Sequence, residues 1–401
     1  MDSVHHSEAI KLLHKGELQK LENVVTKNIR KEKNATQESI MFGNMILMDG
    51  YISKGKLKEA FELFEQLIIN PSVQKNNHMK SKLFRCINYF LFRISPKSVE
   101  IRPYMSHSNI NLMNASLVIH NNQMVSLIRG HNYKRDNKRY IISGDPWDRI
   151  ISKTFVYIYD NYFRILFHKE VEDFGVYPRS IQSPIIGYED PRVFSYNNTL
   201  YFTATSLECF NHPRPTMVLC RLDNKYNVDK TVILQCQNMT DQQKNWLPFV
   251  DEKNRVLVIY KFSPFIINEI DIENGSFKEI VNREIPQTFF PFIRGSTSPI
   301  PYNEGYLFSV HFVNYDTPVE DTYFTKLVWM NKSFEIKKIS GTFILEHLGV
   351  EYISGLVNWN GNIYMSYNIH DTQSKLARFH RITLDHHMKW YDFNTGKSCQ
   401  L

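Results

Sequence analysis

The chain has 401 residues, which is enough for two or three domains or for one large repeat fold with an extension. Hydrophobic residues make up 42% of the chain, so a substantial core is possible, but only 16 residues are glycine, which disfavours a glycine-rich nucleotide-binding fold. The net charge of +7 is a mild excess, and no aromatic-interleaved basic motif indicates nucleic-acid binding. Basic residues are densest at 27–33 and 131–139, either as solvated surface or as groups that attract anionic donors, phosphates or membranes.

The cysteines and the N-terminal segment indicate the cellular compartment that we expect for the protein. Five cysteines without a Cys-x-x-Cys pair predict neither a disulfide framework nor a zinc site, and we expect no metal and no cofactor. The N-terminal segment is polar and unlike a signal sequence, and no apolar stretch reaches 18 residues. We therefore expect a cytoplasmic protein without a membrane span.

Residues 1–95 are predicted to form a helical extension. Apolar residues recur at helical spacing from Ala9 to Val25 and again from Met41 to Ile69. The second stretch resembles a tetratricopeptide unit, with Ala60 at the helix contact and Pro71 ending the second helix. Gly16 and Gly55 mark the turns of two hairpins. Such an extension either packs on the rest of the chain or binds a protein partner.

From about residue 100 the sequence predicts a mainly β domain that ends near residue 395. Short runs of Val, Ile, Tyr and Phe alternate with turn sequences such as HNNQ, YNNT, DEKN, YNEG and NWNG. Asn-Gly at Asn360-Gly361 is a strong hairpin signal.

One pattern occurs five times in this domain. An opening of polar residues enters an apolar strand, a short turn follows, and a second apolar or aromatic strand ends on polar residues. The copies begin at Asn114, Glu189, Lys244, Arg294 and Ile353. Intervals of this size suit one four-stranded blade per copy, so the pattern predicts a five-bladed β-propeller in which the openings converge around the central axis.

The second copy opens with two carboxylates, Glu189 and Asp190, followed by Pro191 and Arg192. Adjacent strand residues face opposite sides, so the two carboxylates should have different roles, and Arg192 should share the face of Asp190. A carboxylate in a pocket acts as a general acid or base when its environment tunes its pKa. The alternative is a structural strand entrance.

The other copies add candidate binding residues. In the third, Lys244 and Asn245 supply an ammonium and an amide, and Trp246 either stacks on a sugar or fills the space between blades. In the fourth, Arg294 and Ser296 can hold an anion, and the strand pair ends at His311. The remaining candidates, from the first and fifth copies, are Asn114, Arg129, Tyr367 and Asp371.

Together these motifs resemble the five-bladed propeller of the mannoside phosphorylases, glycoside hydrolase family 130, over residues 105–380. The matching segments are Asn114-Ala-Ser, Gly187-Tyr-Glu-Asp-Pro-Arg, Lys244-Asn-Trp, Arg294-Gly-Ser-Thr with Gly305-Tyr-Leu before His311, and Tyr367-Asn-Ile-His-Asp. The chain resembles more closely still the bacterial relatives that join tetratricopeptide-like helices to this propeller and are taken to be glycosyltransferases.

The resemblance implies a role for each matched residue. Asp190 would be the catalytic acid/base and Asp371 a sugar-binding carboxylate. Lys244, Asn245 and Arg192 would line the donor site, with Arg294 and His311 on its anion-binding side. The chain departs from the family at Ala115, where a proline is usual, at Tyr260–Phe262, where the phosphorylases often have an arginine, and at Tyr323–Lys326, where the transferases often have a histidine.

We therefore expect a glycosyltransferase that moves a hexose, with mannose expected, from a nucleotide sugar or sugar phosphate to a glycan acceptor. One catalytic carboxylate suits this reaction because hydrolysis needs two. Two alternatives stay open. The first is a β-mannoside phosphorylase that uses inorganic phosphate, and the second is a non-catalytic carbohydrate-binding or scaffold propeller.

Overall fold

The computed structural model describes residues 4–31, 35–54, 56–68, 92–93, 97–101, 110–136, 139–175, 183–209, 215–235, 244–285, 293–314, 321–381, 384–385, 388–395 and 398–401. The chain divides into a unit built mainly from residues 1–92 and a unit of residues 93–285 and 293–401. The short strand β1 (Phe92–Arg93) lies at this boundary. No helix among the described residues combines the length and the apolar character needed to cross a bilayer.

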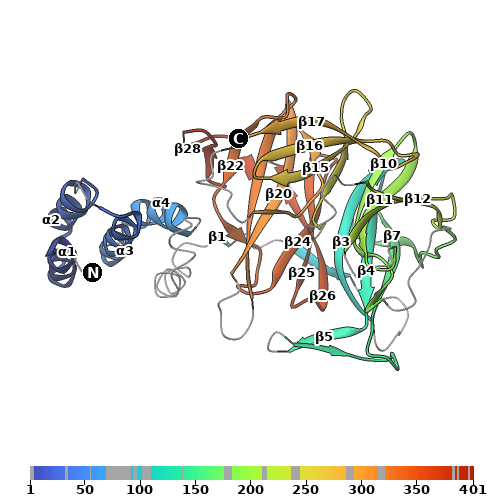
Figure 1. Cartoon of the computed structure of the whole chain (residues 1–401), viewed down its shortest axis with the longest axis horizontal. Coiled ribbons are helices and arrows are strands. Elements are labelled where there is room, and N and C mark those ends of the chain that lie inside the picture. The colour runs from blue at the N-terminus through green and yellow to red at the C-terminus, as the bar shows by residue number, and fades with distance from the viewer. Residues whose placement is uncertain are drawn as a thin grey trace. The chain divides into compact units, whose positions relative to one another are not determined.

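The first unit is helical, as its spacing predicts (Figure 1). Its described elements are α1 (Val4–Lys15), α2 (Leu18–Asn23), the π-helix η1 (Val24–Ile29), α3 (Gln37–Ser53) and α4 (Leu57–Ile68). Gly16, with a φ of 68°, ends α1, and the hydroxyl of Thr36 caps α3 by accepting the Ser39 N–H at 3.1 Å. Ala60 is fully buried on α4, as a close helix contact requires. Gly55 and Pro71 lie outside the described residues.

The second unit consists mainly of antiparallel sheets, and most of them are built on four strands. The first comprises β3 (Asn111–His120), β4 (Gln123–His131), β7 (Ile150–Tyr159) and β8 (Ile165–Glu170), with β9 (Ile185–Ile186) parallel to β7. The next comprises β10 (Glu189–Tyr196), β11 (Thr199–Ser206), β12 (Thr216–Leu222) and β13 (Val228–Ile233). It is followed by β14 (Leu247–Val250), β15 (Val256–Phe262), β16 (Phe265–Ile270) and β17 (Phe277–Arg283).

The remaining sheets take strands from both ends of the unit. One contains β18 (Arg294–Gly295), β19 (Ile300–Tyr302), β20 (Gly305–Asn314), β21 (Thr322–Asn331) and β22 (Ile336–Ser340), extended by β23 (Phe343–Ile344), β27 (Trp390–Asp392) and β28 (Ser398–Cys399). The last contains β24 (Glu351–Trp359), β25 (Asn362–Ile369) and β26 (Gln373–His380), and β2 (Lys97–Ile101) pairs with β26 at its outer edge. A separate hairpin consists of β5 (Tyr133–Asp136) and β6 (Arg139–Ile142).

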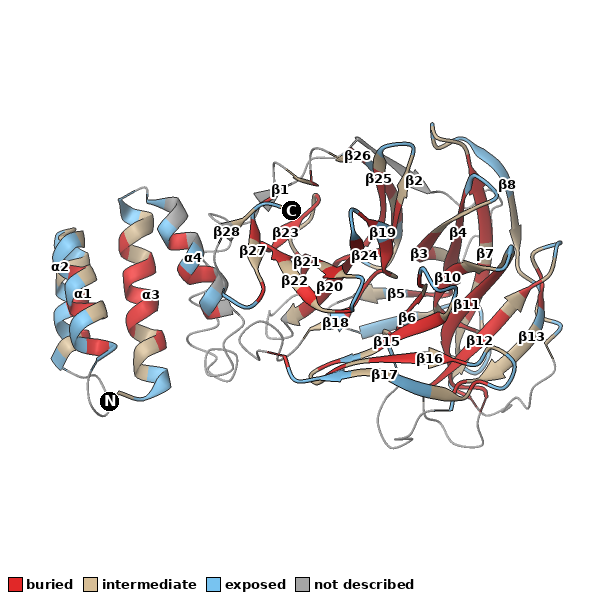
Figure 2. Ribbon diagram, turned by 90° about the horizontal axis from the view of Figure 1, so that it is seen from above, coloured by how far each residue is buried: buried red, intermediate tan, exposed pale blue. Residues whose placement is uncertain are grey.

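These sheets form a β-propeller arrangement because their inner strands contact one another in a ring. β3 contacts both β10 and β24, β10 contacts β14, β15 contacts β18, and β20 contacts β24. Buried residues, red in Figure 2, dominate inner strands such as β4 and β11, whereas outer strands such as β8 and β17 are largely exposed or half-buried.

The predicted turns join the inner strand pairs. Asn121 and Asn122, Asn197 and Asn198, and Asn360 and Gly361 all have positive φ, as a two-residue type I′ hairpin turn requires. Asparagine tolerates this conformation better than other residues with a side chain, and glycine adopts it freely. These turn predictions are confirmed.

Candidate active site

The inner strands open with irregular backbone that gathers polar side chains. Asn114, Asp190 and Asn245 have φ values of 51°, 51° and 62°, in the left-handed region that asparagine and aspartate tolerate. The strand register shifts at Asn114 in β3, at Asp190 in β10 and at Ser354 in β24. Such bulges re-aim a side chain at the end of a strand. Three of the five polar openings in the sequence pattern, those of the first, second and fifth copies, are therefore sites of bulges.

Two of these bulged residues meet each other. Asn114 Nδ2 donates a hydrogen bond of 2.7 Å to Asp190 Oδ1, and Arg129 Nη1 donates to the same oxygen at 3.2 Å. The Asp190 side chain is 31% exposed, so a substrate can reach it. Burial alone would raise the pKa of Asp190, but the charge of Arg129 and the Asn114 hydrogen bond outweigh it, and the pKa lies below its ordinary value. Asp190 is therefore a carboxylate at neutral pH.

Glu189 and Asp190 bind the same Arg129 guanidinium, so the prediction that they face opposite sides of the strand is wrong, because the register shift between Glu189 and Arg192 interrupts the alternation. Glu189 Oε1 accepts a hydrogen bond of 2.8 Å from Arg129 Nη2, and both side chains are almost fully buried. Arg129 Nε also donates to Ser152 Oγ at 2.9 Å, so the guanidinium is fixed on three sides. On the outer side Lys244 Nζ lies 3.6 Å from Glu189 Oε2 and is 42% exposed. Glu189 thus holds one buried and one accessible cation beside Asp190.

Arg192 connects its own sheet to two others. Its guanidinium donates hydrogen bonds to the backbone carbonyls of Ser296 and Ser354, the latter at 2.8 Å, and to the Tyr352 hydroxyl. Arg192 is only 2% exposed. The structure therefore gives no support to the prediction that Arg192 lines the donor site, because its donors are occupied by the protein.

Ser296 and His311 are also internal. Ser296 Oγ and His311 Nδ1 are 2.8 Å apart, and both residues are buried. Burial, together with the charges of Arg294 and Arg192, lowers the pKa of His311 to about 3, so the imidazole is neutral. A neutral, buried histidine is a poor anion ligand. Arg294, directly opposite His311 in the strand register, is exposed and remains the candidate cation from this sheet.

Trp246 and Tyr367 lie in apolar cores rather than at the charged openings. Trp246 is 2% exposed and packs against Tyr260 and Phe277, with ring centroids 5.1 and 5.3 Å away. Tyr367 is fully buried, and its hydroxyl donates to Glu346 Oε2 at 3.3 Å. Neither ring is accessible for stacking on a sugar, so both predictions of substrate contact lose their geometric basis. Asn245, next to Trp246, is half-buried.

Asp371 is the centre of a second group of polar residues. Asn368 Nδ2 donates to its Oδ1 at 3.1 Å, Arg135 Nη1 lies 4.0 Å from its Oδ2, and His131 Nε2 lies 2.8 Å from its backbone carbonyl oxygen. Arg135 also donates to Asp321 Oδ2 at 2.5 Å. Burial raises the pKa of Asp371 to about 6, and the negative charge of Asp190 adds to the shift, so the two carboxylates are close enough to interact.

The sequence analysis missed His131, Arg135 and Asp321. His131 and Arg135 belong to the basic segment 131–139, one interpretation of which was solvated surface. The available signal was the alternation within the β5–β6 hairpin, which places Tyr133, Arg135, Tyr140 and Ile142 on one face. The contact of that hairpin with Asp371 joins segments more than two hundred residues apart, which no local pattern encodes.

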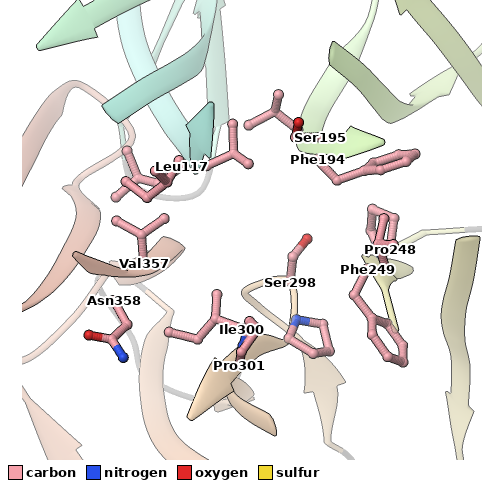
Figure 3. Close-up of a pocket in the computed structure, with 15 residues that line it drawn as sticks. Leu117, Phe194, Ser195, Pro248, Phe249, Ser298, Ile300, Pro301, Val357 and Asn358 are labelled. Carbon is pink, nitrogen blue, oxygen red and sulfur yellow. The ribbon is translucent and has the colours of Figure 1, made fainter. Parts of the chain in front are cut away.

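Further along the same inner strands lies an apolar cavity of about 460 Å³ (Figure 3). Its lining includes Leu117, Val193, Pro248, Ser298 and Val357, which follow Asn114, Asp190, Asn245, Ser296 and Ser354 by two or three residues in each strand. A rise of about 3.3 Å per residue places this cavity roughly 10 Å beyond the charged openings. Each of these five segments thus contributes one residue to the polar openings and one to the cavity lining, and the lining residue is apolar in all of them except at Ser298.

Comparison with known proteins finds neither a matching family model nor a matching curated protein. The fold is similar to that of solved structures at low sequence identity. A β-1,2-mannobiose phosphorylase from Listeria innocua is 14% identical, with 70% of this chain and 92% of that chain covered and a TM-score of 0.48. A GDP-Man-dependent mannosyltransferase from Leishmania mexicana is 13% identical, with coverages of 78% and 96% and a TM-score of 0.48. A mannose phosphorylase from the same organism is 13% identical, with coverages of 77% and 95% and a TM-score of 0.47.

Within the described ranges, no three His, Cys, Asp or Glu side chains are grouped so that they could hold a metal ion. The chemistry available at the openings is that of a deprotonated carboxylate, accessible cations and a second carboxyl group with a raised pKa. Two carboxyl groups whose environments separate their pKa values are typical of proton transfer.

Proposed function

We propose that the chain is a glycosyltransferase that moves a hexose, with mannose as our candidate, from a nucleotide sugar or sugar phosphate to a glycan acceptor. The observation that carries this proposal is Asp190, an accessible carboxylate kept deprotonated by Arg129 and Asn114 beside the exposed Lys244. The propeller that holds it is proposed to have five blades, one for each copy of the sequence pattern. Residues 100–395 would form this catalytic propeller and the N-terminal helices a site for a protein partner.

In the proposed reaction Asp190 accepts the proton of the acceptor hydroxyl. The acceptor oxygen forms a bond to the anomeric carbon as the bond from that carbon to the donor phosphate oxygen breaks. Lys244 and Arg294, the exposed cations of the openings, neutralise the charge that develops on the leaving phosphate. Asp371 binds hydroxyl groups of the transferred sugar.

A phosphorylase is the second candidate, and the raised pKa of Asp371 is the observation in its favour. Phosphorolysis requires a group that donates a proton to the leaving sugar, and a carboxyl group with a pKa of about 6 retains a proton closer to neutral pH than Asp190 does. In this reaction inorganic phosphate would attack the anomeric carbon, and the glycosidic oxygen would leave with that proton.

One assay separates these reactions. The protein is incubated with a manno-oligosaccharide acceptor and either GDP-mannose or mannose 1-phosphate, and the release of GDP or phosphate is measured. We expect consumption of GDP-mannose. Consumption of mannose 1-phosphate alone would favour the phosphorylase, and glycan binding without turnover of either donor would identify a carbohydrate-binding propeller.

A further inference from the structure

The β5–β6 hairpin and the loop after it carry two exposed aromatic side chains. Tyr140 is 54% exposed and Trp147 is 72% exposed. Each ring has an arginine over it, Arg135 at 5.9 Å from the Tyr140 centroid and Arg149 at 4.4 Å from the Trp147 centroid. A guanidinium over one side of a ring orients the ring, and the exposure shows that much of each ring remains open.

The Tyr140 ring and the Asp371 carboxylate share Arg135 as a neighbour. Tyr140 is directly opposite Arg135 in the hairpin, and Arg135 Nη1 lies 4.0 Å from Asp371 Oδ2. A single guanidinium group therefore separates the two. The aromatic stack continues inward, because Tyr140 contacts Tyr133 edge-on at 4.9 Å and Tyr133 contacts His131 at 3.9 Å.

Trp147 belongs to the same end of the propeller. Arg149, which holds its ring, interacts electrostatically with Glu208, and Glu208 follows the strand that pairs with β10 at Glu189. Both ends of the 143–149 segment are tied to Asn132, whose Nδ2 donates to the carbonyls of Ser143 and Arg149 at 2.9 and 3.1 Å. These hydrogen bonds anchor both ends of the segment that carries Trp147.

We propose that Tyr140 and Trp147 form a platform for the extended part of an oligosaccharide whose reacting end lies at Asp190 and Asp371. Open aromatic faces suit the apolar faces of pyranose rings. The inference rests on the proposed function for the identity of the reacting end. It assigns the platform to the acceptor rather than to the donor, because the rings lie outside the carboxylates.

Binding of sugar hexaoses tests this inference without requiring turnover. Hexaoses and bioses of mannose, glucose and galactose are titrated into the full chain by calorimetry. We expect at least one hexaose to bind more tightly than its biose. Tyr140→Ala and Trp147→Ala should each weaken hexaose binding about three- to tenfold and leave biose binding unchanged.

Tyr162 provides a matched control. It is 68% exposed, with Arg164 at 5.7 Å from its ring centroid, but it lies in the turn that follows β7, whereas Trp147 precedes the other end of β7. Tyr162→Ala should leave all affinities unchanged, and Tyr140→Phe, which keeps the ring, should retain hexaose binding. Circular dichroism should show the same fold in each variant, since these side chains are exposed.

Three results would overturn the platform: no hexaose binds, hexaose and biose affinities fall equally in Tyr140→Ala and Trp147→Ala, or Tyr162→Ala has the same effect. Binding of phosphatidylserine vesicles that depends on Tyr140 and Trp147, without hexaose binding, would assign the rings to a membrane surface instead. Turnover of a donor with a biose acceptor is measured separately. If that turnover persists while hexaose binding is absent, the proposed function survives and the platform does not.

Discussion

At the residue scale, the environment of each carboxylate decides its chemistry. Asp190 and Asp371 are both aspartates at strand ends, yet the pKa of one is lowered and that of the other is raised. Arg129 donates a hydrogen bond directly to Asp190, whereas Arg135 stands 4.0 Å from Asp371 and is hydrogen-bonded to Asp321. The sequence identified both aspartates, but it could not identify their partners, because those contacts come from distant strands.

The raised pKa of Asp371 predicts a specific dependence of the unfolding free energy on pH. This pKa is raised from 3.8 to about 6 in the folded chain, so folding is favoured while the group is protonated. The stability that this group contributes is present below about pH 4 and is lost as the pH rises through 6. Relative to Asp371→Asn, the wild type should lose up to about 3 kcal/mol of unfolding free energy across this window.

Urea denaturation of both proteins at pH 4, 5, 6 and 7 measures this difference. The quantity to compare is the change with pH and not the absolute stability, because Asp371→Asn also removes the contact with Arg135. Parallel pH profiles for the two proteins would show that Asp371 titrates normally and would remove the basis for a protonated group at this position.

At the element scale, short-range signals predicted the inner hairpins well and their side-chain orientations less well. Asn-Asn and Asn-Gly turns are locally encoded, and the structure has them where they were expected. The bulges at Asn114 and Asp190 were not predicted, since a shifted register depends on the partner strand. For the same reason Trp246, one of the candidate sugar contacts, turned out to fill the core between sheets.

The buried Trp246 and the exposed Trp147 give a matched pair of stability predictions. Trp246→Ala removes a fully packed ring and should destabilise the propeller by about 3–5 kcal/mol. Trp147→Ala removes a ring that is 72% exposed and should change the stability by less than about 0.5 kcal/mol. Thermal and urea unfolding measure both values. Equal effects of the two substitutions would contradict the placement of Trp246 in the core.

At the scale of the whole molecule, the ring is closed by contacts that span the chain. β2, near residue 100, completes the sheet of β24, β25 and β26, and Arg192 connects its own sheet to Ser296, Tyr352 and Ser354. The predicted start of the β domain at residue 100 falls inside β2, because a strand that pairs with the far end of the chain has no local signature. The mainly β class itself was predictable from composition and turns.

The edge strand gives a test of this closure. A chain that begins at Arg93 keeps β2, whereas one that begins at Ile110 exposes the edge of β26 and loses the backbone pairing of Lys97–Ile101. We expect the shorter chain to unfold at a lower temperature and to self-associate in size-exclusion chromatography. Identical behaviour of the two chains would mean that β2 does not contribute to the closed ring.

The most direct test of the proposed function is transfer by Asp190→Asn. This substitution keeps the size of the side chain but removes the group that accepts the proton. We predict that transfer from GDP-mannose to a manno-oligosaccharide falls by about 10²- to 10⁴-fold, while the fold and the affinity for GDP-mannose are retained. Full transfer activity in this variant would contradict the assignment of Asp190 as the catalytic base.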